Sequence, residues 1–431
     1  MREMKDSGVA WIGKIPHSWN VVRNKGLIFE VNERCEADTD LPLLSVSEYY
    51  GIAPKAEKIA DGDFISRAES LKDYKICHVD DVVMNIMLAW KRAQGVSNFN
   101  GIVSPAYCVY RKKENAPINM AYYHYLIRSD LYISVFKRYS TGIIDSRLRL
   151  YPDKFLALYS HVPPLEDQQK IAAHLDRKCT QIDALISNAQ QQIEKLKAYK
   201  QSVITETVTK GLDPDVKMKD SGVEWIGEIP GNVELTKASH LFNVILGKMV
   251  SPTKSKADET LESYFCAANV HFDDLQYDEL KTMWFDSNEK ENYLVQKGDL
   301  LVVEGGAGAG GSHIVEKDIE NCYVQNFVMI VRRKKHVPEK WLYYIIYMLV
   351  KNNYIDYVCN KATIPHFTKD KLNNTPVVFY KEEQMKKMIA YLDHKCSQID
   401  KLIALKQQKI EKLQQYKKSL IYEYVTGKKE V

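Results

Sequence analysis

The stretch LDRKCTQIDALI, residues 175–186, occurs a second time as LDHKCSQIDKLI at residues 392–403. Nine of the twelve positions are identical, and the copies lie 217 residues apart, about half of the 431-residue chain. A second repeat precedes each copy, because MKDSGVAWIGKIP (residues 4–16) matches MKDSGVEWIGEIP (residues 218–230) at eleven of thirteen positions. A period of half the chain indicates a duplicated protein that performs one task twice.

Between these repeats the two halves stay in register but diverge. Asp81 in DVVM aligns with Asp299 in DLLV, and the pair Tyr122-Tyr123 aligns with Tyr343-Tyr344. We therefore expect two homologous halves with constant ends and divergent middles. A single larger scaffold built from the repeats would instead predict middles as similar as the ends.

The composition is that of an ordinary soluble protein, with 45% hydrophobic and 27% charged residues and a net charge of +4. This weak positive charge permits a nucleic-acid partner without requiring one. The eight cysteines form no CxxC pair, which argues against a zinc site or a disulfide framework, so no metal is expected. The start MREMKDSG contains no apolar run, and no apolar stretch is long enough to span a bilayer, so we expect a cytoplasmic protein.

Two long stretches carry apolar residues at spacings of three and four, with lysine, glutamine and glutamate on the other face. They run from about residue 165 to 209 and from about residue 382 to 425, without internal Gly or Pro. Each would form a helix roughly 60 Å long, whose narrow apolar stripe needs a second helix to cover it. We predict an intramolecular antiparallel coiled coil, whereas two separate surface helices would leave the stripes exposed.

The divergent middles predict mixed α/β (α+β) globular domains, because short β-rich runs alternate with Gly, Asn and Asp turns. Each middle also predicts one helix, at residues 118–139 and 339–358. The expected order is a first globular domain (1–162), a first helical region (163–217), a second globular domain (218–378) and a second helical region (379–431). The fold class is therefore a duplicated α/β domain joined to two long helices.

The most enzyme-like motif is the glycine loop EGGAGAGG at residues 304–311, which follows the strand-like run DLLVV. Such loops bring backbone N–H groups and a helix N-terminus to a cofactor. The following SHIVEKD does not read as a helix, and the corresponding residues 85–95 lack the glycines. GxxxxGK[ST], HExxH and GxSxG are also missing from the sequence, so we expect no catalytic residues and no cofactor in this chain.

Basic and amide residues concentrate where the halves differ, as two readers of different specificity require. Arginine recognises guanine, and Asn or Gln recognises adenine, through two hydrogen bonds each, while cations contact phosphates. The candidate DNA-binding residues are Lys91, Arg92, Gln94, Ser146, Arg147 and Arg149 in the first half, and Lys248, Gly308, Ser312, His313, Gln325, Asn326, Lys361 and His366 in the second.

The chain closely resembles the specificity subunit of type I restriction-modification systems. The resemblance rests on WIGKIP and WIGEIP, and on VPPLEDQQKIA (162–172) followed by Leu175-Asp176 and QID (181–183). It implies two target-recognition domains that read a bipartite double-stranded DNA target, and two helices that set its spacer. It also implies two methyltransferase subunits, which bind S-adenosylmethionine, restriction subunits for cleavage, and a bacterial or archaeal cytoplasm.

The constant repeats are the expected docking sites for these partners. They are Trp11, Gly13, Pro16 and Asp176 in the first half, and Trp225, Gly227, Pro230 and Asp393 in the second. The second half departs from the family pattern at PGNV (230–233) and at Phe379-Tyr380, which replace PHSW and two prolines. Two other classes of protein stay open: a stand-alone S-adenosylmethionine-dependent methyltransferase that uses residues 305–311, and a coiled-coil adaptor whose DNA affinity is indifferent to sequence.

Overall fold

The computed structural model describes residues 3–35, 39–55, 71–144, 147–359 and 365–431. Its contacts divide the chain into unit 1, residues 1–190 and 407–431, and unit 2, residues 191–406. Each unit combines one globular domain with a part of both long helices, α5 (Leu165–Lys210) and α11 (Glu382–Val425). Contacts thus group the end of α11 with the first globular domain, whereas the four regions predicted from the sequence follow chain order.

Unit 1 is built around an antiparallel four-stranded sheet. Its order is β4 (Ile28–Val31), β11 (Cys108–Lys112), β8 (Val82–Met84) and β9 (Gln94–Val96). The strand pairs are β1 (Met4–Asp6) with β2 (Lys14–Pro16), β3 (Asn20–Arg23) with β12 (Tyr159–Val162), β5 (Leu44–Ser47) with β6 (Gly51–Pro54), and β7 (Lys75–Cys77) with β10 (Gly101–Val103). The short helices are α1 (Asn24–Leu27), η2 (Ala89–Lys91), α2 (Met120–Arg128), α3 (Asp130–Tyr139) and α4 (Pro152–Ala157).

Unit 2 repeats this plan. Its four-stranded sheet has the order β16 (Phe242–Leu246), β22 (Val328–Arg333), β19 (Leu300–Val303) and β20 (Ser312–Ile314). The other strands are β13 (Met218–Asp220) with β14 (Glu228–Pro230), β15 (Glu234–Lys237) with β23 (Pro376–Phe379), and a sheet of β18 (Lys281–Phe285), β17 (Thr260–Phe265) and β21 (Cys322–Val324). The helices are α6 (Ala238–Leu241), η4 (Ala267–Asn269), α7 (Ser287–Tyr293), α8 (Glu339–Lys351), α9 (Tyr354–Val358) and α10 (Lys369–Asn374).

The central strands β8 and β19 show why these sequences form buried sheets. Alternate side chains of a strand point to opposite faces, and in β19 Leu300 and Val302 enter one core cluster while Leu301 and Val303 enter another. A strand covered on both faces must be apolar throughout, which explains the runs DVVM and DLLVV. The predicted duplicated α/β fold is thereby confirmed.

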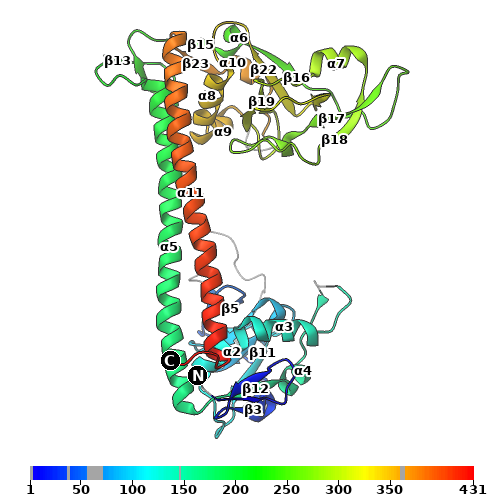
Figure 1. Cartoon of the computed structure of the whole chain (residues 1–431), viewed down its shortest axis with the longest axis vertical. Coiled ribbons are helices and arrows are strands. Elements are labelled where there is room, and N and C mark those ends of the chain that lie inside the picture. Colours follow the sequence, from blue (N-terminus) through cyan, green and yellow to red (C-terminus); the bar gives the residue numbers. More distant parts are fainter. Residues whose placement is uncertain (1–2, 36–38, 56–70, 145–146, 360–364) are drawn as a thin grey trace. The chain divides into compact units, whose positions relative to one another are not determined.

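The two long helices pack antiparallel within each unit, as predicted (Figure 1). In unit 1 the Lys417 ammonium contacts both carboxylate oxygens of Asp183, at 2.6 and 2.7 Å. In unit 2 Lys200 contacts both oxygens of Asp400, at 2.9 Å each. One pair is the repeat image of the other, since Lys200 and Asp183 lie 217 positions before Lys417 and Asp400. Among the described residues, no helix combines the length and apolar content needed to cross a membrane.

The single helix expected in each divergent middle is interrupted. Ser129 lies between α2 and α3 with extended backbone, and its hydroxyl donates to the Leu126 carbonyl at 2.8 Å. Asn353 separates α8 from α9 with a left-handed φ of 60°. Serine and asparagine side chains bond nearby backbone groups and so favour such breaks. The expected continuous helices at 118–139 and 339–358 are therefore corrected to two helices each.

The alignment of the two tyrosine pairs is also corrected. Tyr125 donates to Asp176 at 2.7 Å, and Tyr344 donates to Asp393 at 2.5 Å, so these two tyrosines are equivalent at an offset of 219. The sequence alignment used an offset of 221. The difference arises because seven residues separate β11 from α2, whereas only five separate β22 from α8. Tyr122 consequently corresponds to Trp341, and both donate to a carbonyl of the strand before the long helix.

Candidate nucleic-acid interface

Three segments that are distant in sequence meet beyond the end of β19 in unit 2. They are the glycine loop, the turn Gln325–Phe327 and the segment that precedes α10. The Glu304 N–H donates to the Phe327 carbonyl at 2.8 Å, and the Phe367 N–H donates to the Glu304 carbonyl at 2.6 Å. Gly305 forms a β-bridge with His366, and a Cβ at Gly305 would lie 2.9 Å from that imidazole. Position 305 therefore needs glycine, because its backbone lies close to the His366 and Phe327 rings.

The turn before β22 adds amide groups to this site. The Asn326 N–H donates to the Lys248 carbonyl at 2.8 Å, and the Gln325 amide donates to the Asn326 side chain at 3.2 Å. The Lys248 ammonium bonds the Glu289 carboxylate at 2.5 Å, so its charge is compensated within the unit. Lys248, Gly308, Gln325, Asn326 and His366 thus belong to one region, and Lys248 acts there through its backbone.

The same place in unit 1 carries different chemistry. The Leu150 N–H donates to the Ile86 carbonyl at 2.9 Å, which corresponds to the bond between Phe367 and Glu304. Ile86 therefore occupies the position that Glu304 has in unit 2. Arg149, which forms a β-bridge with Thr141, occupies the position of His366. The turn after β10 begins at Ser104, where unit 2 has Gln325. Two scaffolds built on the same plan thus present different side chains at equivalent positions.

A cationic edge flanks this region in unit 1. Two ammonium groups lie over the Trp90 indole, that of Lys91 at 5.0 Å and that of Lys137 at 4.9 Å from the ring centroid. Lys91, Arg147 and Arg149 are exposed. Arg92 is held inside the unit instead, because it pairs with Asp130 and donates to the Arg128 carbonyl at 3.1 Å.

Like Arg92, three further predicted DNA-binding residues do not join the site. Gln94 and Ser312, the first residues of β9 and β20, are completely buried, and the Gln94 amide donates to the Ile127 carbonyl at 3.0 Å. The expectation that they reach DNA is corrected, because their polar groups face the interior. His313 contacts the His271 and Phe272 carbonyls at 3.2 and 3.3 Å and packs beside Tyr343 of α8. Ser146 and Lys361 lie outside the described residues.

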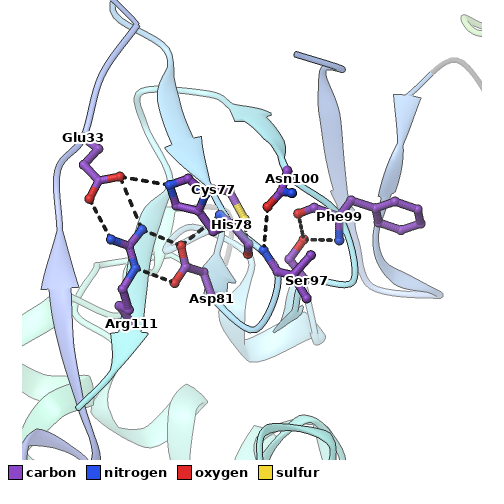
Figure 2. Close-up of polar contacts among 9 residues, drawn as sticks. Glu33, Cys77, His78, Asp81, Ser97, Phe99, Asn100 and Arg111 are labelled. Carbon is purple, nitrogen blue, oxygen red and sulfur yellow. Dashed lines mark hydrogen bonds and ion pairs between the residues drawn. The ribbon is translucent and has the colours of Figure 1, made fainter. Parts of the chain in front are cut away.

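A duplicated Arg–Asp pair supports the sheet that carries each site. Figure 2 shows Arg111 between two carboxylates, with contacts of 3.0 Å to each oxygen of Asp81 and of 2.7 and 3.3 Å to Glu33. Bonding and charge from Arg111 lower the pKa of Glu33, against the opposing effect of burial. In unit 2 Arg332 contacts Asp299 at 2.7 and 2.8 Å. Arg332 therefore anchors β22 to β19 and is not free to contact a phosphate.

The constant repeats pack within their own units. The Trp11 ring meets Tyr132 edge-on at 5.1 Å, and the Trp225 ring lies 4.9 Å from Tyr354. Gly13 and Gly227 have φ of 73° and 70°, a conformation that favours glycine, and Pro16 and Pro230 are buried. Asp176 and Asp393 accept the tyrosine hydroxyls of α2 and α8, which ties each globular domain to its long helix. That these residues also dock partner subunits stays a prediction.

Full-length relatives exist among known proteins, although no family model matches the chain. The type I restriction enzyme MjaVIII specificity subunit of Methanocaldococcus jannaschii is 25% identical, over 96% of this chain and 94% of the relative. The MjaX specificity subunit of the same organism is 23% identical, over 97% of this chain and 95% of the relative.

Two solved structures share the fold. A chain from a study of complex assembly and conformational transition of the type I R-M system superposes with a TM-score of 0.70 at 15% identity, covering 95% of this chain and 98% of that one. The HsdS subunit from Thermoanaerobacter tengcongensis superposes with a TM-score of 0.53 at 16% identity, covering 96% of this chain and 98% of that one.

A duplicated scaffold with two chemically different loop sites is the arrangement that a recognition protein with two readers requires. The relatives are named specificity subunits, which agrees with the prediction of a reader without catalytic residues. Over nearly its whole length the chain is similar to proteins named specificity subunits of type I restriction-modification systems, and the resemblance predicted from the sequence is confirmed.

Proposed function

We propose that this chain is the DNA sequence-recognition subunit of a type I restriction-modification complex. Each globular domain reads one half of a bipartite target, and the helices set the spacer and dock two methyltransferase subunits. The observation that carries the proposal is the pair of equivalent sites in which Ile86 and Arg149 of unit 1 stand where unit 2 has Glu304 and His366. A shared scaffold with different side chains at one position is what two readers of unlike half-sites require.

The glycine loop supports a reader more than a methyltransferase. A cofactor loop of this type leads into a helix whose N-terminus receives the ligand. Here residues 304–311 lead into strand β20, and the Gly310 and Gly311 N–H groups bond the Val303 and Gly308 carbonyls at 2.9 and 2.8 Å. We therefore assign S-adenosylmethionine to the partner methyltransferase. Restriction subunits are the further partners for cleavage.

Exchange of one globular domain tests this function. If residues 20–162 are replaced by the equivalent domain of another specificity subunit, one half-site should change completely while the other half-site and the spacer stay the same. The measurement is sequencing of modified adenines in DNA from cells that express the chain with its methyltransferase subunit. A change of both half-sites would contradict modular reading, and unaltered methylation without this chain would contradict the recognition role.

The exposed face of the helix pair offers two repeat-related surfaces for the methyltransferase subunits. In unit 1 the side chains of Leu185 and Tyr416 are 49% and 53% exposed, and in unit 2 those of Tyr199 and Leu402 are 52% and 47% exposed. Leu185 corresponds to Leu402 and Tyr199 to Tyr416 at an offset of 217. Large exposed apolar groups at matched positions suit one partner per unit.

Replacing either Leu185 or Leu402 with aspartate should prevent the binding of one methyltransferase subunit. We expect Leu185→Asp and Leu402→Asp each to yield a complex with a single methyltransferase subunit, and the double variant to yield none, since a buried charge in such an interface costs several kcal/mol. Native mass spectrometry measures the stoichiometry. Leu212→Asp is the matched control, because Leu212 is equally exposed, at 48%, but lies beyond the end of α5. Two bound subunits in every variant would place docking elsewhere.

A further inference from the structure

Resting on the proposed function, we propose that Glu304 reads a base with an exocyclic amine in the major groove, cytosine or adenine, in the half-site of unit 2. A carboxylate only accepts hydrogen bonds, and these two bases alone present an amine donor in that groove. The expectation drawn from the sequence placed the glycine loop near DNA but did not include the acidic residue that begins it.

The backbone of Glu304 is held by two neighbouring segments. Its N–H bonds the Phe327 carbonyl and its carbonyl receives the Phe367 N–H, so the residue lies between the turn before β22 and the segment before α10. The side chain follows Val302 on the same face of β19, one step beyond the end of the strand. The Phe327 and His366 rings, whose centroids are 6.1 Å apart, belong to exposed residues beside it.

The carboxylate itself has no hydrogen-bond donor among the residues that the structure describes. It is half-buried, and this burial raises its pKa, while the neighbouring His366 opposes the rise. Removing a carboxylate from water without giving it a donor is unfavourable. An external donor such as a base amine would satisfy it and offset that cost.

The equivalent position in unit 1 strengthens the assignment. Ile86 stands there and packs against the core of its unit, so the shared fold does not require a carboxylate at this place. An acidic group close to DNA phosphates also lowers the affinity for all sequences. Such a cost is retained where it discriminates against wrong partners.

The test uses the assembled complex of the full chain with its methyltransferase subunits. Binding is measured on duplexes in which each position of both half-sites is varied through all four base pairs. The variants are Glu304→Ala and Glu304→Gln, and the control is Glu320→Gln, which removes the same charge from an exposed position in the β20–β21 loop of the same unit. The half-site of unit 1 serves as an internal control for folding and assembly.

We expect Glu304→Ala to lower the preference at one position of one half-site by roughly ten- to a hundredfold. Affinity for unrelated DNA should rise, which a merely structural role would not produce. Glutamine distinguishes the two bases, because it pairs with adenine through two hydrogen bonds. Glu304→Gln should keep the preference if the base is adenine and shift it toward adenine if the base is cytosine.

Two outcomes would overturn the inference. One is an unchanged preference at every position in both Glu304 variants. The other is an equal loss of preference in both half-sites, which would indicate a general structural effect. A wild-type complex without any bipartite preference would overturn the proposed function first, and it is recognised before any variant is compared.

Discussion

Lowering the pH from about 7 to about 5 should destabilise unit 1 by about 4 kcal/mol and affect unit 2 much less. Burial lowers the pKa of His161 to about 4, and burial together with Arg128 lowers that of His124 to about 3. A histidine with a depressed folded pKa stays neutral in the native state while the unfolded chain gains a proton below about 6.5. The contribution of each histidine to the free energy of unfolding is therefore complete above that pH. It falls as the pH drops toward the folded pKa, by about 1.4 kcal/mol for each pH unit.

Both histidines have defined neutral roles in unit 1. The His161 Nε2 group lies 2.5 Å from the Val425 carbonyl and donates to it, which ties the end of α11 to the first globular domain. The His124 Nδ1 atom accepts from the Val96 N–H at 3.2 Å and so must remain unprotonated. In unit 2 the raised pKa of the Glu304 carboxyl has the opposite effect on stability, because its protonation on acidification relieves a native-state cost.

Hydrogen–deuterium exchange of peptides from each unit, at pH 7 and pH 5 with correction for intrinsic rates, measures this difference. The double variant His124→Asn and His161→Gln is the control, since Asn retains the acceptor and Gln retains the donor without a titratable ring. Its unit 1 should lose much less protection on acidification than that of the wild type. Equal acid sensitivity of the two units would contradict the prediction.

Replacing Asp81 or Asp299 by alanine should destabilise the unit that contains it by about 3 kcal/mol or more. The side chains of these aspartates are 2% and 5% exposed, and each holds an arginine of the neighbouring strand through two contacts. Figure 2 shows the pair of Asp81 and Arg111. Each also accepts from a backbone N–H three residues earlier, that of His78 at 2.9 Å and that of Gln296 at 2.8 Å. Removal therefore leaves an arginine and a backbone donor without their buried acceptor.

Glu33 provides the matched comparison within the same cluster. It bonds Arg111 as Asp81 does, but its side chain is 44% exposed, so Glu33→Ala should cost less than about 1 kcal/mol. Urea denaturation, followed by exchange or proteolysis of each unit, gives the free energies of unfolding. Equal costs for Asp81→Ala and Glu33→Ala would show that burial does not decide the strength of this cluster.

The duplication, the two long helices, their antiparallel pairing and the resemblance to specificity subunits could all be predicted from the sequence. These features are written as local periodicity or as direct repeats: an apolar stripe at helical spacing needs no knowledge of distant contacts, and residues 175–186 recur almost unchanged at 392–403. The apolar runs at Asp81 and Asp299 likewise predicted the central strands, because a strand buried on both faces must be apolar throughout.

Which side chains meet at the sites could not be predicted from the sequence, because it depends on contacts between distant segments. Gln94 and Ser312 carry polar groups in divergent segments, yet both are completely buried at the first positions of β9 and β20. Glu304 reaches His366 because a bridge pairs its loop with a segment about sixty residues away, and no spacing in the sequence encodes that approach. Pairing between distant strands depends on loop lengths and on the packing of the whole unit, and so does the side to which each loop residue points.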